Sequence, residues 1–398
     1  AYTIHRRIYR EKAFAGVDGQ FSLNDNLYTD TLFMVDEASM IANMGLGGTT
    51  FGSGCLLDDL VKFVYQGHND RLLLIGDKAQ LPPVGEEESP ALSASVMEGY
   101  GLKVYECDLN EVLRQSQSSG ILYNATLIRQ MITHDAVTGL PLIRFKGFAD
   151  IVMMPGAELV ESLGDSYHHV GMDETMVITR SNKRANIYNN GIRNMVLDRE
   201  EELSSGDMLM IVKNNYFWTE KEKKESGEGS AGAVPAFLAN GDRAKVLRVS
   251  NYIELYGFRF ATLLLQLPDY DDYEMQVTGM LDTLQSEAPA LTHEQQEELF
   301  RQVEEDYQHF VPLKADRMKS IRQDAYFNAL QIKYAYAVTC HKAQGGQWAH
   351  VYVDQGYMTD DMLTPDYIHW LYTAFTRATD KLFLVNWPKE QTCEPTDL

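Results

Sequence analysis

Two carboxylates directly follow a short apolar run near the start of the chain, an arrangement that could serve nucleotide chemistry. The run LFMV (32–35) ends in Asp36-Glu37. If it is a strand of a parallel sheet, its carboxyl end lies at the edge where α/β proteins bind ligands. In a nucleotide hydrolase the first carboxylate would hold Mg²⁺ through water, and the second would orient the attacking water. An acidic turn after a strand is also a common structural feature, so this pair alone is a weak signal.

A second apolar run is followed by residues that could sense a phosphate. LLLI (72–75) leads into GDKAQLPP (76–83). The amide of Gln80 both donates and accepts hydrogen bonds, so it could contact a γ-phosphate and a water together. Pro82 and Pro83 restrict the backbone of the loop, which could link the phosphate state to a binding surface. The alternative is that this segment is only a structural turn ended by proline. That alternative does not explain why the pattern follows a strand that ends in Asp-Glu.

Two arginines lie in further segments of interest. Arg114 is part of LNEVLRQS (109–116), and Arg377 is part of LYTAFTRAT (371–379). The planar, permanently charged guanidinium suits a transferring phosphate. A lone Arg is nevertheless more often a surface cation.

The segment VTCHKAQGG (338–346) combines hydrogen-bond donors with two adjacent glycines. Small residues let backbone amides approach phosphates closely. A lone His or Lys would favour a structural role, so the signal lies in the combination. The candidate residues of this segment are Thr339, His341, Lys342, Gln344 and Gly345.

Apolar runs of strand length recur along the chain and must position these residues. Because they are apolar at every position, they predict strands buried on both faces of a parallel sheet covered by helices. Residues 118–132 and 367–378 have apolar residues at helical spacing. This alternation predicts an α/β fold in two copies. The apolar runs are 32–35, 72–75, 176–179, 351–353 and 382–385.

The second copy carries an insertion of a different kind. Strand-like segments around an Asn240-Gly241 turn predict a small β-barrel at about 205–285. The charged, Gly/Ser-rich stretch 220–234 is expected to be a flexible loop within it. A helical segment is expected to follow at about 292–327.

The chain is acidic, because 57 Asp and Glu against 35 Lys and Arg give its 398 residues a net charge of −22. A surface that is a polycation for nucleic acid or membranes is thereby excluded, but a local basic groove is not. Residues 269–306 contain twelve acidic residues and one basic residue, so this segment carries a charge of −11, half of the net charge of −22. We expect this acidic insert to keep nucleic acid from binding outside its track.

Cysteine usage and hydropathy bear on the compartment. Four widely spaced cysteines argue against a disulfide framework or a zinc site and favour a reducing, cytoplasmic compartment. No run of 18 apolar residues is present, which argues against a membrane as partner. The chain begins with Ala rather than Met, and we expect a fragment of a longer protein.

Taken in order, the candidate segments resemble the motifs of superfamily 1 helicases of the RecD and Dda type. The matching stretches are DEASM (36–40), GDKAQLPPV (76–84), LNEVLRQ (109–115), VTCHKAQG (338–345) and LYTAFTRAT (371–379). TIHR (3–6) is similar to the segment that follows motif Ia in that family. The resemblance implies two RecA-like parallel-sheet domains at 1–155 and 156–398, the second carrying the β-barrel and the helical insert.

The resemblance also implies roles for individual residues at an ATP site. Asp36 would coordinate Mg²⁺, Glu37 would activate water, and Gln80 would sense the γ-phosphate. Arg114 and Arg377 would act as arginine fingers, contacts worth about 10³ to 10⁵ in rate. The other residues expected to bind ATP are Gly76, Asp77, Gln344 and Gly345.

Single-stranded or forked DNA is the partner that the resemblance implies, with movement in the 5′→3′ direction. Other replication or recombination proteins are left open as partners. Residues 9–30 occupy the place of the family's strand-splitting hairpin, where Phe14, Phe21 or Tyr28 could stack on bases, although packing is their commoner role. The residues expected to face DNA are His5, Pro82, Pro83, Thr339, His341 and Lys342.

The chain departs from the family at the phosphate-binding loop. The pattern GxxxxGK(S/T) does not occur, and FGSGC (51–55) has no Lys or Thr that could replace it. Without that loop there is no amide cradle and no β/γ-phosphate lysine, so we expect a piece of a longer helicase that hydrolyses ATP poorly as it stands. Two alternatives stay open: a non-catalytic protein that binds single-stranded nucleic acid, and an RNA helicase.

Overall fold

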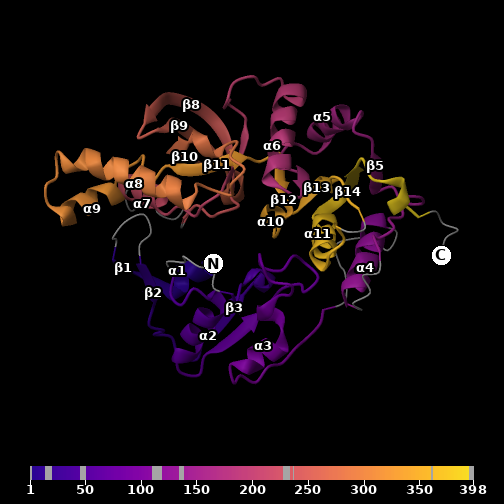
Figure 1. The fold of residues 1–398 in the computed structure, drawn as a ribbon, viewed down its shortest axis with the longest axis horizontal. Helices are drawn as coiled ribbons and strands as arrows, with labels where there is room; N and C mark the ends of the chain where they lie inside the picture. Colours follow the sequence, from indigo (N-terminus) through magenta and orange to yellow (C-terminus); the bar gives the residue numbers. More distant parts are fainter. Residues whose placement is uncertain are drawn as a thin grey trace. The chain divides into compact units, whose positions relative to one another are not determined.

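A computed structural model gives the fold of the chain (Figure 1). It describes residues 2–13, 20–44, 51–109, 119–133, 139–226, 234–235, 237–359 and 362–393. The chain divides into two compact units: unit 1 is built from Ala1–Ile151, Tyr357–Thr379 and Pro388–Leu398, and unit 2 from Val152–Gly356 and Asp380–Trp387. Both units are therefore assembled from segments that are distant in sequence.

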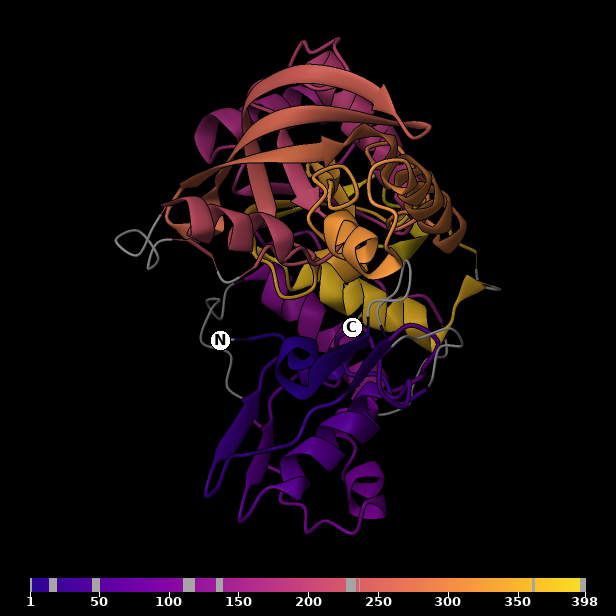
Figure 2. The same ribbon diagram turned by 90° about the vertical axis from the view of Figure 1, so that its left-hand side faces the viewer.

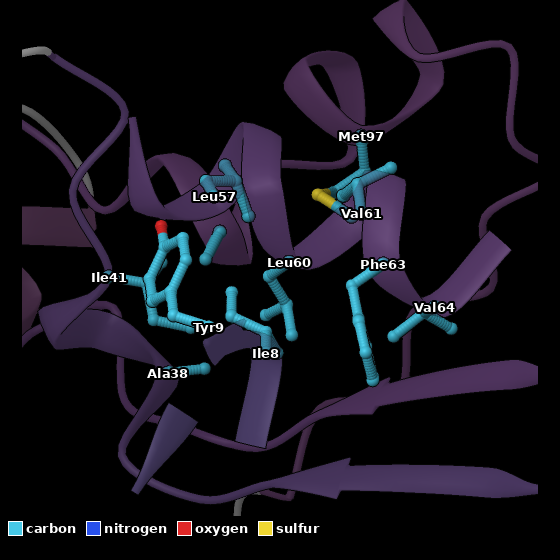
Figure 3. Packing of buried hydrophobic residues seen from close by; sticks show 11 residues of the cluster. Ile8, Tyr9, Ala38, Ile41, Leu57, Leu60, Val61, Phe63, Val64 and Met97 are labelled. Carbon is cyan, nitrogen blue, oxygen red and sulfur yellow. The ribbon is translucent and has the colours of Figure 1, made fainter. Parts of the chain in front are cut away.

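Helix α2 (Leu56–Gln66) carries one side of the core of unit 1. Two aspartates in its first turn favour the helix electrostatically, because the N-terminal end of a helix is partially positive. Leu57, Leu60 and Phe63 are buried, and Figure 3 shows them packed with Ile8 and Tyr9. Burying each such side chain contributes about 1.5–3 kcal/mol.

Four short strands and two short helices complete this part of unit 1. Strand β1 (Tyr9–Ala13), which follows helix α1 (Ile4–Ile8), pairs antiparallel with β2 (Gln20–Leu23). Strand β3 (Leu32–Val35) pairs in parallel with β4 (Arg71–Leu74), and helix α3 (Ala94–Gly99) follows later in the chain. The parallel pair β3 and β4 carries the first two candidate loops at its carboxyl end.

The expectation that β3 and β4 are buried on both faces is wrong. Their residues alternate between exposed and half-buried positions. Phe33 and Leu72 pack against the core cluster, whereas Leu32, Met34 and Leu73 on the other face are 54%, 66% and 42% exposed. An apolar run shows that both faces of a strand could be buried, but other elements of the fold decide whether each face is covered.

Two longer helices of unit 1 lie close to the lengths expected from sequence. Helix α4 (Gly120–Thr133) begins after Ser119, whose hydroxyl accepts a hydrogen bond from the Leu122 amide at 3.1 Å. Helix α11 (Pro365–Phe375) has Thr364 as its N-cap, and proline is favoured in the first turn because its missing amide would be unpaired anyway. The two helices pack against each other.

Unit 2 contains a five-stranded sheet with the order β12-β6-β13-β14-β5. Strand β6 (Thr175–Thr179) pairs in parallel with both β12 (Ala337–Thr339) and β13 (Trp348–Asp354). All five residues of β6 are buried, as expected for a strand covered on both faces. The remaining strands are β14 (Ala378–Val385) and β5 (Ile151–Met154), and the first two helices of the unit are α5 (Leu159–His169) and α6 (Asn182–Gly191).

A closed barrel of order β10-β11-β7-β8-β9 is inserted in unit 2. The longest strands, β8 (Arg243–Leu255) and β9 (Phe258–Leu267), curve across the unit in Figure 2. They are joined at Tyr256-Gly257, and both residues have positive φ, which matches the twist of a two-residue hairpin turn. The other strands are β7 (Met208–Ile211), β10 (Tyr273–Met280) and β11 (Leu330–Tyr334).

Two details of the expected insert are wrong, and a third is refined. The barrel closes with β11, which lies beyond the expected range 205–285. Part of the stretch expected to be strand and loop is helix α7 (Phe217–Ser226), which is rich in the good helix formers Lys and Glu. The helical segment expected at 292–327 is two helices, α8 (His293–Gln308) and α9 (Lys314–Arg322), because Pro312 cannot continue a helix interior.

The expected α/β class is confirmed: unit 1 contains the parallel pair β3-β4, and unit 2 contains a five-stranded sheet with the β-barrel and helices inserted. The division into units differs from the expected 1–155 and 156–398, because the described residues 357–359, 362–379 and 388–393 belong to unit 1. The limits of the two domains along the sequence stay a prediction. Within the ranges that the structure describes, no helix is long and apolar enough to cross a membrane.

Candidate functional site

The first two candidate loops leave their strands side by side. Beyond β3 and β4, the Ile75 amide donates to the Val35 carbonyl at 2.9 Å, and the Ala38 amide donates to the Ile75 carbonyl at 2.8 Å. These bonds extend the parallel ladder past the strands. The structure therefore brings Asp36-Glu37 and Gly76-Asp77 together at the carboxyl edge of the pair.

Glu37 has a backbone conformation that residues other than glycine rarely adopt. Its φ of 51° and ψ of 39° lie in the left-handed region, which is disfavoured for an L-residue by about 1–2 kcal/mol. Asp36 is exposed, and its Oδ1 accepts a hydrogen bond from the Glu37 amide at 2.9 Å. Strain of this kind clusters at functional sites, so it supports the choice of Glu37 as a candidate.

Gly76 is needed where the two loops approach each other. A Cβ at this position would lie 3.0 Å from the Ser39 amide nitrogen and 3.3 Å from that of Ala38. Both neighbours are backbone atoms, which cannot move aside as a flexible side chain would. The close approach of these backbone atoms therefore favours glycine at position 76. Contact between Gly76 and ATP stays a prediction.

Asp77 is the acceptor for three groups of unit 1. Its Oδ1 accepts hydrogen bonds from the Ala79 amide at 3.0 Å and from Arg129 Nη1 at 2.9 Å. Its Oδ2 accepts a bond from the Tyr372 hydroxyl at 2.8 Å, and that hydroxyl accepts one from Arg129 Nη1 at 2.8 Å. Burial, together with the Asp77 charge, raises the pKa of Tyr372 to about 12. In this structure Asp77 therefore holds its own loop to helices α4 and α11.

Two further contacts fasten the loop 76–83 to α11. The Leu81 amide donates to Thr373 Oγ1 at 2.9 Å. His369 Nδ1 lies 2.9 Å from the Ala79 carbonyl oxygen and 3.1 Å from that of Gln80. Because carbonyl oxygens only accept, Nδ1 carries the proton. The backbone of Gln80, the expected phosphate sensor, is thus positioned by the segment that contains LYTAFTRAT.

The structure does not place Pro82 and Pro83 on an exposed surface. Both prolines are buried, and Val84, which follows them, is 71% exposed. Contact between the prolines and DNA therefore stays a prediction that this arrangement does not favour.

The candidate arginine fingers have different outcomes. Arg377 is 4% exposed, and its guanidinium donates from Nε to the Thr373 carbonyl at 3.1 Å and from Nη2 to Thr376 Oγ1 at 3.1 Å. Both bonds are to the end of its own helix. Arg114 lies outside the described residues.

The candidate residues of VTCHKAQG lie in unit 2, around the short helix α10 (Cys340–Ala343). Thr339 ends β12 and precedes the helix, and His341 is exposed. Gln344 follows the helix and is half-buried, and Gly345 has a φ of 82°, which favours glycine. The helix is anchored by its other residues, because Cys340 and Ala343 are fully buried.

Lys342 of α10 donates a hydrogen bond to Asn240 Oδ1 in the barrel. Burial lowers the pKa of Lys342. The structure thereby connects the candidate DNA-binding helix to the Asn240-Gly241 turn of the barrel.

His5 and the aromatic residues of the expected hairpin pack against unit 1. The His5 ring lies 5.1 Å from that of Phe51, which stacks on Phe21 at 4.5 Å between ring centroids. Burial lowers the pKa of His5. The guanidinium of Arg7 lies 4.5 Å above the Tyr28 ring. Packing thus accounts for Phe21, whereas Tyr28 is 38% exposed and its stacking on bases stays a prediction; Phe14 lies outside the described residues.

Sequence reasoning did not single out Arg129, His369, Tyr372 or Thr373 as candidates. Three of them lie in or beside LYTAFTRAT, so their position next to this motif could have indicated a role at the site. Arg129 is a half-buried residue of α4, and its role is visible only from its contacts with Asp77 and Tyr372. Among the described residues, no group of three or more His, Cys, Asp and Glu could hold a metal ion.

Comparisons with known proteins bear on the helicase resemblance. A protein of Acanthamoeba polyphaga mimivirus described as uncharacterised is 22% identical over 396 residues, covering 88% of this chain and 74% of that protein. A Bacteroides Pif1 helicase in complex with ADP-AlF3 and single-stranded DNA is 13% identical, with a TM-score of 0.45 over 92% of this chain and 72% of that chain. A Pif1 structure described as unwinding forked duplex DNA is 12% identical, with a TM-score of 0.48 over 99% of this chain and 80% of that chain.

The family described as the UvrD-like helicase C-terminal domain matches residues 334–385. This segment contains VTCHKAQG and LYTAFTRAT, two of the five stretches on which the resemblance depends. The narrower RecD and Dda subtype stays a prediction. Residues 334–385 are therefore similar to the UvrD-like helicase C-terminal domain, and the expected resemblance to superfamily 1 helicases is confirmed for this segment.

Proposed function

We propose that this chain is the motor portion of an ATP-dependent DNA helicase of the RecD and Dda type. It would couple ATP hydrolysis to 5′→3′ movement along single-stranded DNA and to duplex unwinding. One observation carries the proposal. Ala38, which follows Asp36-Glu37, is hydrogen-bonded to Ile75 at the start of the loop 76–83. That loop is in turn hydrogen-bonded to α11, so three of the five helicase-like stretches meet in unit 1.

The chemistry of the residues at this edge suits nucleotide hydrolysis. Glu37 would orient the attacking water, and Gln80, whose backbone is held by His369, would respond to the γ-phosphate. Asp77 would act as a positioning residue, because its oxygens already accept bonds from Arg129 and Tyr372.

The residues present also fit a nucleotide-borne Mg²⁺. This ion keeps several waters and is bound by one or two carboxylates together with substrate phosphates. Asp36 offers one exposed carboxylate at the sheet edge, which matches that requirement better than a cage made of protein ligands would. When bound, Mg²⁺ would neutralise charge on the phosphate oxygens.

The nucleic-acid side of the proposal rests on unit 2. Thr339, His341 and Lys342 would contact the backbone of the strand through hydroxyl, imidazole and ammonium donors. Solved Pif1 structures similar in sequence at 12–13% are described with single-stranded DNA or forked duplex DNA.

The proposal is tested by Glu37→Gln in the natural-length protein. ATP hydrolysis in the presence of single-stranded DNA should fall by about 10²–10⁴, because the general base is lost, while strand binding is retained. Glu88→Gln, at an exposed carboxylate of the same unit, should leave hydrolysis unchanged. Full hydrolysis by Glu37→Gln would contradict the assignment.

Two further measurements separate the neighbouring functions. If the natural-length protein binds single strands without hydrolysing ATP, it is a non-catalytic binding protein rather than a motor. Competition between RNA and DNA oligonucleotides of the same sequence decides whether the track is DNA. The chain of 398 residues, which contains no GxxxxGK(S/T), should itself bind strands but hydrolyse ATP poorly.

A further inference from the structure

Helix α6 presents a row of asparagines to the segments that join the barrel to the sheet of unit 2. Asn182, Asn186 and Asn189 follow one another at spacings of four and three residues, so they share one face of the helix. The helix itself packs against β6 and β12 of the sheet (Figure 1). A helix that belongs to the sheet therefore carries amides that reach the insert.

The first two asparagines hold a loop of the insert. Asn182 Nδ2 donates to the Glu287 carbonyl at 3.0 Å. Asn186 Nδ2 donates to the carbonyls of Gln285 at 2.8 Å and Ser286 at 3.2 Å. Because every acceptor is a backbone oxygen, these contacts fix the path of the chain rather than the orientation of its side chains.

Asn189 holds the crossing where the chain leaves the barrel and enters the sheet. Strand β11 ends at Tyr334, and β12 begins at Ala337. Asn189 is 2% exposed, and its Oδ1 accepts from the amides of Tyr336 at 3.1 Å and Ala337 at 2.8 Å. Its Nδ2 donates to the Ala337 carbonyl at 2.9 Å. Successive amides of a regular strand point to opposite sides, so two that meet one oxygen mark a kink, and Asn189 supplies the acceptor for it.

The residues of this kink are also bound to the barrel and to the sheet. The Tyr336 hydroxyl donates to Asp207 Oδ1 at 2.8 Å and accepts from the Met208 amide, at the start of β7, at 3.2 Å. The Ala335 amide donates to the Met208 carbonyl at 2.9 Å. From the sheet, the Val177 amide of β6 donates to the Tyr336 carbonyl at 3.0 Å. The crossing is therefore fixed from both sides.

The kink determines where β12 begins, and this matters because β12 has only three residues to hold its own register. In the observed register Ala337 lies opposite Val177 of β6. A slip by one residue would turn every side chain of the strand to the other face. Because Thr339 ends β12 and precedes α10, a slip would also displace the fully buried Cys340 at the start of that helix. Asn189 thus supports the register of the segment that leads into α10.

We propose that Asn189 is a positioning residue for the strand-binding segment of unit 2. By fixing the kink it sets the register of β12 and so presents Thr339 and Lys342 to a single-stranded nucleic acid. Asn182 and Asn186 assist by holding the insert to the same helix. This role rests on the proposed function, which assigns nucleic-acid contact to the segment but not the residues that hold it in place. Asn189 itself does not touch the strand, because its amide is buried and bonded within the protein.

Asn189→Ala in the 398-residue chain tests this role, with an oligothymidylate as the probe in a fluorescence anisotropy titration. The substitution leaves two buried backbone amides without their acceptor, so a smaller fraction of molecules keeps the native register. The apparent dissociation constant rises by the inverse of that fraction. We expect binding to weaken about tenfold, with the number of sites per chain unchanged. A chain that is merely destabilised would instead show fewer sites at unchanged affinity.

Alkylation of Cys340 by iodoacetamide, followed by mass spectrometry of its peptide, gives a local readout that needs no nucleic acid. The thiol is fully buried, so it reacts only when β12 and α10 open. Asn189→Ala should accelerate this reaction about tenfold. The matched control is Asn190→Ala, the same change at the next residue of α6, whose side chain is hydrogen-bonded to none of the residues that the structure describes. It should change neither alkylation nor strand affinity.

The two readouts together separate this role from the proposed function. If Asn189→Ala accelerates alkylation but binds the strand as the wild type does, Asn189 is only structural; the positioning role is refuted and the proposed function stands. Weaker binding without faster alkylation, or no change in either, refutes it as well. If the wild-type chain binds no strand, both fail. If Asn189→Ala does not fold, Asn189→Asp replaces it with the same expected results, because it keeps the size of the side chain but turns an oxygen toward the Ala337 carbonyl.

Discussion

Replacing Tyr372 by Phe should loosen the loop 76–83 without changing the loop itself. The Tyr372 hydroxyl donates to Asp77 Oδ2 and accepts from Arg129 Nη1, both at 2.8 Å. The ring packs in a largely buried position and is kept in the variant. The ion pair of 2.9 Å between Arg129 and Asp77 is also kept, so the substitution removes one polar group from an otherwise intact cluster.

The size of the effect can be worked out from the exposure of the partners. A hydrogen bond to a charged group contributes about 1.5–3 kcal/mol. The Arg129 side chain is 41% exposed and that of Asp77 is 24% exposed, so water can replace part of what is lost. We therefore expect the lower value, about 1.5 kcal/mol, for the free energy of opening the loop, which corresponds to about tenfold in the opening equilibrium.

Hydrogen exchange at the Leu81 amide measures this opening directly. That amide donates to Thr373 Oγ1, and it can exchange only when the loop separates from α11. Near neutral pH Tyr372 is uncharged, since its pKa is raised to about 12, so the comparison with Phe is between neutral side chains. Exchange at Leu81 should be about tenfold faster in Tyr372→Phe, provided that it proceeds by local opening.

Tyr188→Phe is the matched control in unit 2. The Tyr188 hydroxyl donates to Asp354 Oδ2 at 2.6 Å, so the same chemical change is made to a tyrosine–aspartate contact of the other unit. It should leave the Leu81 amide unaffected. The reasoning is refuted if Tyr372→Phe does not accelerate exchange at Leu81, or if both variants accelerate it equally.

Four other predictions concern stability and charge. Glu37→Gly should stabilise unit 1 by about 1 kcal/mol, because it relieves the left-handed strain, whereas Glu37→Gln should not; calorimetric melting compares them. Asp207→Asn should destabilise unit 2 by about 3–5 kcal/mol in denaturant unfolding, because it leaves the buried Arg193 without its counter-charge. Burial lowers the pKa of His350, so the folded unit 2 binds fewer protons than the unfolded chain as the pH falls. The free energy of unfolding of unit 2 should therefore be constant with respect to this group above about pH 6.5 and should decrease below it. His350→Gln should flatten that pH dependence. Neutralising the acidic insert 269–306 should raise non-specific DNA affinity in a binding titration, and unchanged salt-dependent affinity would contradict its proposed role.

The parts of the fold that sequence predicts well are those set by local pattern. The run 176–179 is apolar throughout, and β6 is buried at every position in a parallel sheet. The same kind of run at 32–35 forms β3, but one of its faces is exposed. Local composition gives a strand its capacity for burial, whereas the elements that cover each face are set by the rest of the chain.

The insert shows the same limit for helices and strands. Helix α7 spans the end of an expected strand and the start of an expected loop. Its Trp218 is 5% exposed, and the indole nitrogen donates to the Asn328 carbonyl at 2.9 Å. Residue 328 lies far along the chain, so no local pattern could have revealed this anchor. Barrel closure by β11 likewise depends on pairing with β7 across the whole insert. The break at Pro312, in contrast, was readable from the sequence.

The candidate site also has parts that local sequence predicts and parts that depend on the whole fold. The Asp36-Glu37 and Gly76-Asp77 pairs were predictable, since the carboxyl ends of parallel strands meet at one edge. The partner of Asp77 was not, because Arg129 is 52 residues away in the sequence and only the fold brings its Nη1 within 2.9 Å of the Asp77 carboxylate. Motif recognition therefore identifies the residues that do chemistry more readily than those that hold them in place.

Thr373 shows why the positioning residues matter for the proposed motor. Its hydroxyl accepts from the Leu81 amide, and its carbonyl accepts from Arg377 Nε. Leu81 follows Gln80 directly, so one residue of α11 contacts both the loop of the expected phosphate sensor and the expected arginine finger. If Arg377 leaves the end of its helix to contact a phosphate, it must give up the bond to the same Thr373 whose hydroxyl orients the loop. The loop and the arginine could therefore respond together to one nucleotide without other residues between them, because both already contact the same turn of α11.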